Sequence, residues 1–357
     1  MIKYIVRRLL QSVPTLLGIT ILSYLLMLLA PGGPARALTF GPKVRPEQVR
    51  QLEASLGLSD PWHIQYLRWL LGDDWMRWDS DGDGVSDGSF ILPLDVDGDG
   101  VPEAPGKRKG IIRGDFGTSF FLRRPVSELI GERMGATLEL GISSLIVSLA
   151  FGVPIGIWAA VKHGKWFDSF TRVFAVIVSA LPVFWLGFIL LLIFGQWLRL
   201  LPIGDRGPTT MGPLPPIWER LQYMILPVFV LASGGIAGFS RYMRASMLDV
   251  INQDYIRTAR SKGLSTRQVW FRHGARNAMI PLATFLGPSI TGVIGGAVIT
   301  ESVFNWNGLG RMGVGAVTSQ DYPIVMGVVI IGAVATIIGY LISDILYAVI
   351  DPRIRFS

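Results

Sequence analysis

The stretch IVMGVVIIGAVATIIGYLISDILYAVI, residues Ile324–Ile350, decides the class of fold. Its one charged side chain is Asp344, and it exceeds the ~17–25 residues that a helix needs to cross a hydrocarbon core of ~30 Å. Five further apolar stretches of membrane length precede it. The six predicted spans are Leu9–Ala30, Ala136–Val161, Phe170–Leu198, Tyr223–Phe239, Ile280–Ile299 and Ile324–Ile350. The sequence therefore predicts an all-α membrane protein with six transmembrane helices.

The composition of the whole chain agrees with this prediction. Of 357 residues, 50% are hydrophobic and 17% are charged, and the mean hydropathy is +0.45. An ordinary soluble domain is excluded, because such domains carry about 25% charged residues. The absence of cysteine excludes a disulfide scaffold and a thiolate zinc site, and three histidines are too few for a His-rich metal site.

The distribution of basic residues predicts the orientation of the spans. Lysine and arginine crowd the segments on one side, which include both termini and the loop 240–279, whereas the short loops on the other side hold few. The long loop 31–135 has no weight in this comparison, because long loops cross membranes largely regardless of charge. Both termini are therefore expected in the cytoplasm. A cleaved signal peptide is the alternative, but the first apolar run is longer than the roughly 7–15 residues of a signal's apolar region.

The loop 240–279 is rich in basic residues and carries clear helix signals. Asp254 is expected to cap a short helix, and Gly263 supplies the left-handed conformation that ends it. Ser265 and Gln268 have the spacing of a capping box that starts a second helix. This pair of helices mixes apolar and basic faces, which suits docking on another protein. A loop that only fixes the topology through its positive charge is the alternative.

Part of this loop, QDYIRTARSKGL at Gln253–Leu264, resembles the cytoplasmic loop of ABC importer permeases, in particular those of the dipeptide, oligopeptide and nickel importer family. The resemblance continues at His273 and in the run RNAMIP at Arg276–Pro281. Further matching stretches cover nearly the whole chain in order. They are YIVRRLL at Tyr4–Leu10, GDFGTS at Gly114–Ser119, ATLEL at Ala136–Leu140, GGAVITE at Gly295–Glu301, GLG at Gly308–Gly310, DYP at Asp321–Pro323 and DPR at Asp351–Arg353.

The resemblance implies a type I ABC importer (MetI-like) permease fold in the cell membrane of a prokaryote, with a long outer loop between the first two spans. The implied function is the pathway subunit of an ATP-driven importer that takes up di- or oligopeptides, or related small solutes, by alternating access. The implied partners are a second homologous permease, two ABC ATPase subunits and an extracytoplasmic substrate-binding protein. The sequence contains no G-x-x-x-x-G-K-[ST] motif, so ATP hydrolysis is expected from separate subunits and the chain is not expected to be an enzyme.

In permeases of this kind the cytoplasmic loop supplies a coupling helix, which sits in a groove of the ATPase. The resemblance implies that this helix lies around Leu264–Arg276. Arg257 stands where many related permeases have a glutamate, so no glutamate-based contact is expected. The residues implied to couple to the ATPase are Ala259, Arg260, Gly263, Leu264, Arg272 and Arg276.

The predicted division of the chain follows from the spans. It comprises an N-terminal transmembrane helix at 1–30, an extracytoplasmic region at 31–135, a permease core of five helices at 136–350 with the coupling loop at 240–279, and a cytoplasmic tail at 351–357.

An acidic insert at 72–106 interrupts the outer loop. Two repeats, DSDGDGVSD and DVDGDGVPE, begin at Asp79 and Asp95. Alternating oxygen ligands with a glycine at the sixth position are what Ca²⁺ requires, but the glutamate at position 12 of an EF-hand is absent. The repeats resemble the calcium-binding repeats of thrombospondin type 3 modules, and a solvated acidic linker is the alternative. The predicted ligands of a structural calcium ion are Asp79, Asp81, Asp83, Asp87, Asp95, Asp97, Asp99 and Glu103.

Glycine, proline and carboxylate residues within the predicted spans are the remaining candidates. Glu139 is expected to form a structural hydrogen bond or to line the pathway, and Asp344 to form a structural ion pair. The glycine spacing predicts close helix contacts, and the prolines predict kinks. These residues are the pairs Gly152/Gly156, Gly234/Gly238 and Gly292/Gly296, and Pro154, Pro182, Pro227 and Pro288.

Three other functions fit the sequence less well. An ion-coupled carrier or channel requires polar spans or inverted repeats, and the sequence shows neither. A membrane enzyme requires catalytic groups, but H-E-x-x-H and G-x-S-x-G are absent and no histidine falls within a predicted span. A calcium-dependent membrane surface protein would leave the basic loop unexplained.

Overall fold

The computed structural model describes residues 2–29, 61–72, 109–207, 216–295 and 297–350. These residues form helices and no strand, apart from an isolated bridge between Thr118 and Pro125. They belong to two compact units. The first comprises Met1–Ser12, Arg133–Met312 and Ile331–Ser357, and the second comprises Val13–Glu132 and Gly313–Ile330.

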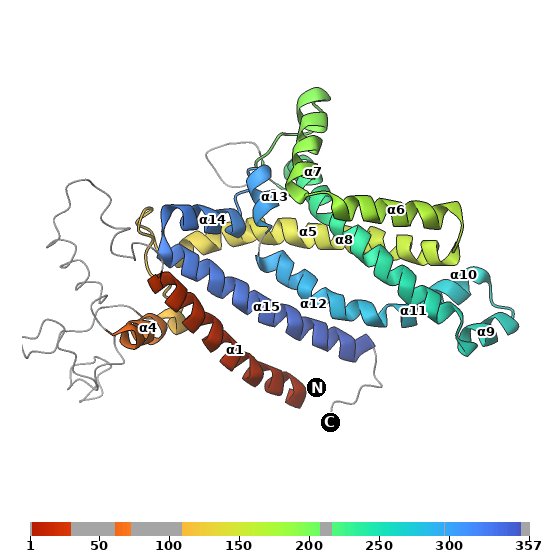
Figure 1. Cartoon of the computed structure of the whole chain (residues 1–357), viewed down its shortest axis with the longest axis horizontal. Helices are drawn as coiled ribbons and strands as arrows, with labels where there is room; N and C mark the ends of the chain where they lie inside the picture. Colours follow the sequence, from red (N-terminus) through yellow and green to blue (C-terminus); the bar gives the residue numbers. More distant parts are fainter. Residues whose placement is uncertain (1, 30–60, 73–108, 208–215, 296, 351–357) are drawn as a thin grey trace, which may run out of the picture. The chain divides into compact units, whose positions relative to one another are not determined.

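The α-helices are labelled in Figure 1, and three short helices, η2, η3 and η4, lie between them in the chain. In chain order they are α1 (Ile2–Leu29), α4 (Trp62–Leu71), η2 (Ile111–Arg113), α5 (Val126–Val161), α6 (Trp166–Ala180), α7 (Val183–Leu190), η3 (Leu191–Trp197), α8 (Ile217–Ile251), α9 (Asp254–Ser261), α10 (Thr266–Gln268), η4 (Val269–Gly274), α11 (Ala275–Ala278), α12 (Ile280–Gly295), α13 (Val298–Val303), α14 (Leu309–Ser319) and α15 (Tyr322–Ile350).

Several helices are long and apolar enough to cross a membrane. Among the described residues there are five such candidates, or six if α6 and the α7–η3 helix count as one bent span. The prediction of an all-helical membrane protein is therefore confirmed. The five candidates are Val6–Leu29, Val126–Val161, Ile217–Ile251, Phe285–Val303 and Tyr322–Leu346.

The third predicted span, Phe170–Leu198, is wrong as a single helix. The chain bends by 100° between α6 and α7. Leu181 is extended there, with φ −79° and ψ 129°, because a residue before proline disfavours the helical conformation. Pro182 has no N–H to continue the helix and starts α7 instead. The predicted kink at Pro182 is therefore a break, whereas Pro154, Pro227 and Pro288 lie inside α5, α8 and α12.

Two other predicted spans differ from the helices at their ends. The fourth, Tyr223–Phe239, is only the middle of α8, which has 35 residues. Its polar C-terminal half continues the helix because it packs against neighbouring elements of the first unit. The fifth, Ile280–Ile299, is shorter as a helix, since α12 stops at Gly295 and α13 starts only at Val298.

The packing of the first unit confirms one of the three predicted glycine pairs. A Cβ on Gly152 would lie 2.9 Å from the Cβ of Phe239, and one on Gly156 would lie 2.6 Å from the carbonyl oxygen of Ser240. These two glycines therefore let α5 approach α8. The pair Gly234/Gly238 forms no such contact among the described residues, because a Cβ on either glycine would meet no atom within 4 Å, and Gly235 faces Ser148 instead. The pair Gly292/Gly296 stays a prediction, since Gly296 lies outside the described residues.

The second unit brings together two stretches that are far apart in the sequence. Asp321, which immediately precedes α15, is 1% exposed and accepts hydrogen bonds from the Ser119 hydroxyl (2.5 Å) and the Phe120 N–H (3.2 Å). A Cβ on Gly327 would lie 3.0 Å from side-chain atoms of Val126 and Ile130. The sequence stretches GDFGTS and DYP are thus joined by a buried carboxylate.

Candidate functional site

The residues 254–278, here called the elbow, form the predicted pair of helices. Gly263 follows α9 with φ 73°, which is the predicted left-handed conformation. The predicted capping box is confirmed: the Ser265 hydroxyl accepts a hydrogen bond from the Gln268 N–H, and Gln268 Oε1 accepts one from the Ser265 N–H at 3.2 Å. The prediction that Asp254 caps the first helix is wrong. Gln253 occupies the cap position without a side-chain hydrogen bond, and Asp254 lies in the first turn, where its charge favours the helix dipole.

The elbow has a small hydrophobic core of its own. Ile256, Ala259 and Val269 are 0%, 6% and 1% exposed and form one cluster, against which Trp270 packs. The Arg260 guanidinium lies 4.7 Å from the centre of the Trp270 ring. Apolar burial and this cation–π contact hold the two helices together.

The outer surface of the elbow combines apolar and basic side chains. Tyr255, Leu264 and Phe271 are exposed hydrophobic residues. Five of the six predicted coupling residues are also exposed, whereas Ala259 lies in the elbow's core and can only support the surface. The exposed basic residues are Arg257, Arg260, Lys262, Arg267, Arg272 and Arg276.

The elbow is anchored on the C-terminal half of α8. The Ser246 hydroxyl donates a hydrogen bond to the carbonyl oxygen of Ala278 at 2.8 Å. A Cβ on Gly274 would lie 3.3 Å from the Met247 methyl group, so only a glycine lets η4 approach this side chain without adjustment. Met243 and Met247 are fully buried in a cluster with Ala275 and Ala278 of the elbow. A displacement of the elbow therefore acts directly on α8.

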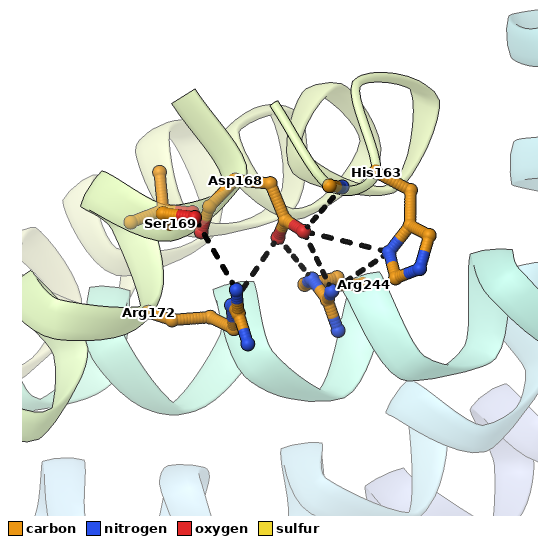
Figure 2. A network of polar contacts seen from close by, with 7 residues as sticks. His163, Asp168, Ser169, Arg172 and Arg244 are labelled. Carbon is orange, nitrogen blue, oxygen red and sulfur yellow. Dashed lines mark hydrogen bonds and ion pairs between the residues drawn. The ribbon is translucent and has the colours of Figure 1, made fainter. Parts of the chain in front are cut away.

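The same half of α8 is tied to the start of α6 by a buried ion pair, which Figure 2 shows. Asp168 has a fully buried side chain, and Arg244 Nη2 donates to its Oδ2 at 2.8 Å while Arg244 Nε donates to Oδ1. The Gly164 N–H donates to Oδ2 at 3.0 Å. Two further nitrogen atoms lie nearby: His163 Nδ1 is 3.4 Å from Oδ2, and Arg172 Nε is 3.7 Å from Oδ1.

Sequence reasoning missed this pair. Asp168 is the only acidic residue between Lys165 and Arg172, in the first turn of α6, and this position was the only available signal. Its partner lies 76 residues away.

A second buried carboxylate joins α13 to α5. Glu301 is fully buried; its Oε1 accepts a hydrogen bond from the Thr137 hydroxyl at 2.9 Å, and its Oε2 accepts one from the Arg311 N–H at 2.8 Å. Thr137 in turn accepts a hydrogen bond from the Leu309 N–H at 2.8 Å. Thr137 of ATLEL, Glu301 of GGAVITE and Leu309 of GLG therefore meet at one point, which no spacing in the sequence indicates.

The two carboxylates singled out in the predicted spans are both paired. Asp344 lies 3.1 Å from Arg8 Nε, which confirms the predicted structural ion pair. Glu139 accepts hydrogen bonds from Arg206 Nε and Arg220 Nη1, each at 2.7 Å.

A cavity of about 210 Å³ lies between α5, α8 and α12. Small and hydroxyl-bearing residues line much of it, and they include Ser144, Ser148, Gly235 and Ser289. No lining residues of a pathway could be named from the sequence.

The predicted calcium ligands, Asp79 to Glu103, lie outside the described residues. Within the described part of the chain, no group of three or more His, Cys, Asp or Glu residues is placed to hold a metal ion.

Comparison with known families decides the identity of the chain. Residues 152–356 match the family described as the binding-protein-dependent transport system inner membrane component, and residues 1–77 match the model of the N-terminal part of such components. The chain belongs to this family. The match spans α8, the elbow and the helices that follow, and it confirms the resemblance found in the sequence.

Similar proteins in this family are named as permeases. The oligopeptide transport system permease protein AppB of Bacillus subtilis is 39% identical over 100% of both chains. The glutathione transport system permease protein GsiC of Salmonella paratyphi A is 36% identical over 100% of both chains, and the dipeptide transport system permease protein DppB of Escherichia coli K12 is 34% identical over 99% of both. These names agree with the prediction of a transporter subunit and not an enzyme.

Among solved structures, the methionine ABC transporter MetNI in an inward-facing conformation is similar to 63% of this chain and 97% of its own, with a TM-score of 0.48 and 16% identity.

Proposed function

We propose that the chain is the membrane pathway subunit of an ATP-driven importer and that its elbow docks on an ATPase subunit in the cytoplasm. The main support for the proposal is that apolar side chains are exposed beside arginines on the surface of the elbow. Leu264 and Phe271 are 36% and 44% exposed beside several arginines, although the elbow has a complete core of its own. An apolar surface with a basic rim on a preformed element suits a groove in a partner protein.

The contacts between the elbow and the C-terminal half of α8 indicate how a movement of the elbow would be transmitted. Closure of the ATPases would displace the elbow, and the packing of Met247 against Gly274 would pass that displacement to α8. The Arg244–Asp168 ion pair would then move the start of α6 with α8. Alternating access would result from the rearrangement of these helices, with both chain termini in the cytoplasm.

The proposed substrates are di- or oligopeptides or related small solutes. Support comes from the relatives, which are named as oligopeptide, glutathione and dipeptide permeases and match the chain over nearly its full length. The partners proposed on the same ground are a second homologous permease, two ATPase chains and an extracytoplasmic substrate-binding protein.

A pull-down of the tagged chain from its native membrane in mild detergent tests this proposal, with the partners identified by mass. We expect a second permease and ATPase chains to be recovered with the wild type, and the ATPases to be lost when Gly263 and Leu264 are replaced. The matched control is Arg124→Gln, which removes an exposed arginine outside the elbow. A chain that purifies alone, or only with itself, would return the ion-coupled carrier and the calcium-dependent surface protein to consideration.

We further propose that the acidic insert at 72–106 binds calcium as a structural ion. Its support is the spacing of Asp79, Asp81, Asp83 and Asp87 and of the second repeat. Terbium luminescence of the full chain, displaced by calcium, measures the binding. Replacement of Asp81 and Asp97 by asparagine is expected to abolish the signal, and a wild-type signal that calcium fails to displace at several millimolar would refute the site.

A further inference from the structure

Two arginines converge on one carboxylate in the first unit. Arg206, in the segment after η3, has its Nε 2.7 Å from Glu139 Oε2. Arg220, in the first turns of α8, has its Nη1 2.7 Å from both oxygens of the same carboxylate. The exposed fractions of the side chains are 10% for Glu139, 16% for Arg206 and 13% for Arg220. The cluster is largely removed from water but still reaches the surface.

The charges of this cluster do not balance. Two guanidinium groups, which stay protonated, face one carboxylate, so the cluster has an excess positive charge. Among the described residues, neither arginine has an ion pair with a second acid: Asp205 accepts a hydrogen bond from Asn305, and Glu219 is exposed on α8. An uncompensated charge in a poorly hydrated site is costly, so the cluster favours the approach of an anion.

The hydrogen-bonding capacity of the cluster is also incompletely used. Arg220 Nη1 lies 2.7 Å from both oxygens of Glu139, whereas Arg220 Nε is buried without a hydrogen-bond partner in the described part of the chain. Each guanidinium has five N–H donors in a fixed plane, and a carboxylate accepts such donors in pairs. A second carboxylate would use donors that Glu139 leaves free.

We propose that Arg206 and Arg220 bind the carboxylate of the transported solute, and that Glu139 is a positioning residue that holds the two guanidinium groups together before the solute arrives. The ligand class is a small solute with a free carboxylate, such as a peptide with an unblocked C-terminus. The inference rests on the proposed function and on the predicted orientation, in which these ends of α5 and α8 face the extracytoplasmic side.

Uptake of dialanine and of dialanine amide by the complete importer in vesicles tests the inference. The same substrate-binding protein is used throughout, so any change in the ratio of the two rates comes from the permease. Arg220→Gln is expected to lower dialanine uptake about tenfold, the size of effect that loss of a hydrogen bond to a charged group produces, with little change for the amide. Glu139→Gln removes the charge that holds the two guanidinium groups together and is expected to raise the KM for dialanine, with little change for the amide. Arg124→Gln, an exposed arginine paired with Glu128 and Glu132, is the control and should change neither rate.

Three outcomes would overturn the inference or its basis, and they are distinguishable. A parallel loss of both substrates in Arg220→Gln would mean that the cluster is only structural. Loss of wild-type uptake in vesicles without anionic lipid, together with a similar loss for Arg220→Gln in vesicles that contain it, would mean that the arginines bind the headgroup of an anionic lipid. Failure of the wild type to take up either compound in any lipid would refute dipeptides as substrates and would remove the basis of the inference.

Discussion

Arg244 binds Asp168 through both of its carboxylate oxygens, and it does so from the half of α8 that also carries the elbow. Met247, one helical turn further along α8, packs under Gly274. One stretch of α8 therefore holds the elbow through apolar contacts and α6 through a buried ion pair. A rigid connection of this kind is what transmission of a movement from the elbow to α6 requires.

Asp168→Asn is expected to destabilise the protein by about 3–5 kcal/mol, because breaking a buried ion pair leaves the other charge uncompensated. Arg244 is 17% exposed and would be the charge left without its partner carboxylate. The thermal unfolding midpoint in detergent, followed by loss of the monodisperse peak, measures the effect.

The matched control for this variant is Asp254→Asn. The side chain of Asp254 is 95% exposed, and its ion pair with Arg257 lies at the surface. Loss of this surface ion pair should change the free energy of unfolding by less than about 1 kcal/mol. The double variant Asp168→Leu with Arg244→Met should recover part of the stability, because two apolar groups leave no buried charge. Equal midpoints for Asp168→Asn and Asp254→Asn would contradict the account of the ion pair.

Gly308→Ala is expected to disrupt the contact between α13 and α5. Its Cβ would lie 2.4 Å from Glu301 Oε1 and 2.6 Å from the Thr137 hydroxyl, so the hydrogen bond between these two groups must break or shift. Loss of a hydrogen bond to a buried charged group costs about 1.5–3 kcal/mol, and a lower unfolding midpoint should report it. The control is Gly131→Ala on α5, whose added Cβ would meet no atom within 4 Å outside its own helix backbone, so this variant should be neutral or slightly stabilising. The same midpoint for both variants would count against the Glu301 network.

The parts of the site that were predictable from the sequence are the local ones. Gly263 and the capping box of Ser265 and Gln268 depend on neighbouring residues, so their spacing was sufficient. The ion pair of Asp168 with Arg244 and the hydrogen bond of Thr137 with Glu301 depend on how the helices pack, which no short window of sequence contains.

Two kinds of sequence pattern, hydropathy and glycine spacing, predicted the helices and their contacts only in part. Hydropathy predicted the spans because burial in lipid requires apolar residues, but it joined α6 to α7 across Leu181 and Pro182, where backbone sterics and not hydrophobicity decide the conformation. The GxxxG spacing succeeded at Gly152 and Gly156 and missed Gly235, because spacing does not say which face of a helix meets a neighbour.

Ser265→Ala is expected to loosen the start of the second helix of the elbow. Removal of an N-cap hydroxyl costs about 1 kcal/mol, so the amides of residues 266–270 should exchange with solvent several times faster in a hydrogen-exchange measurement. Ser261→Ala is the control, since its hydroxyl only contacts the carbonyl of Arg257 in an exposed turn. If the amides near Ile256 exchanged faster and those near Gln268 did not, the capping box would not be what orders the elbow.

ATP hydrolysis by the complete importer in vesicles shows whether the elbow couples this permease to an ATPase. Substrate-loaded binding protein is added, and the wild type is compared with Leu264→Asp, which places a charge on the exposed apolar surface of the elbow. We expect the binding protein to stimulate ATP hydrolysis by the wild type and by Asp254→Asn, and to leave the Leu264→Asp importer at its unstimulated rate. Full stimulation of the Leu264→Asp importer would mean that the elbow does not couple the permease to the ATPase.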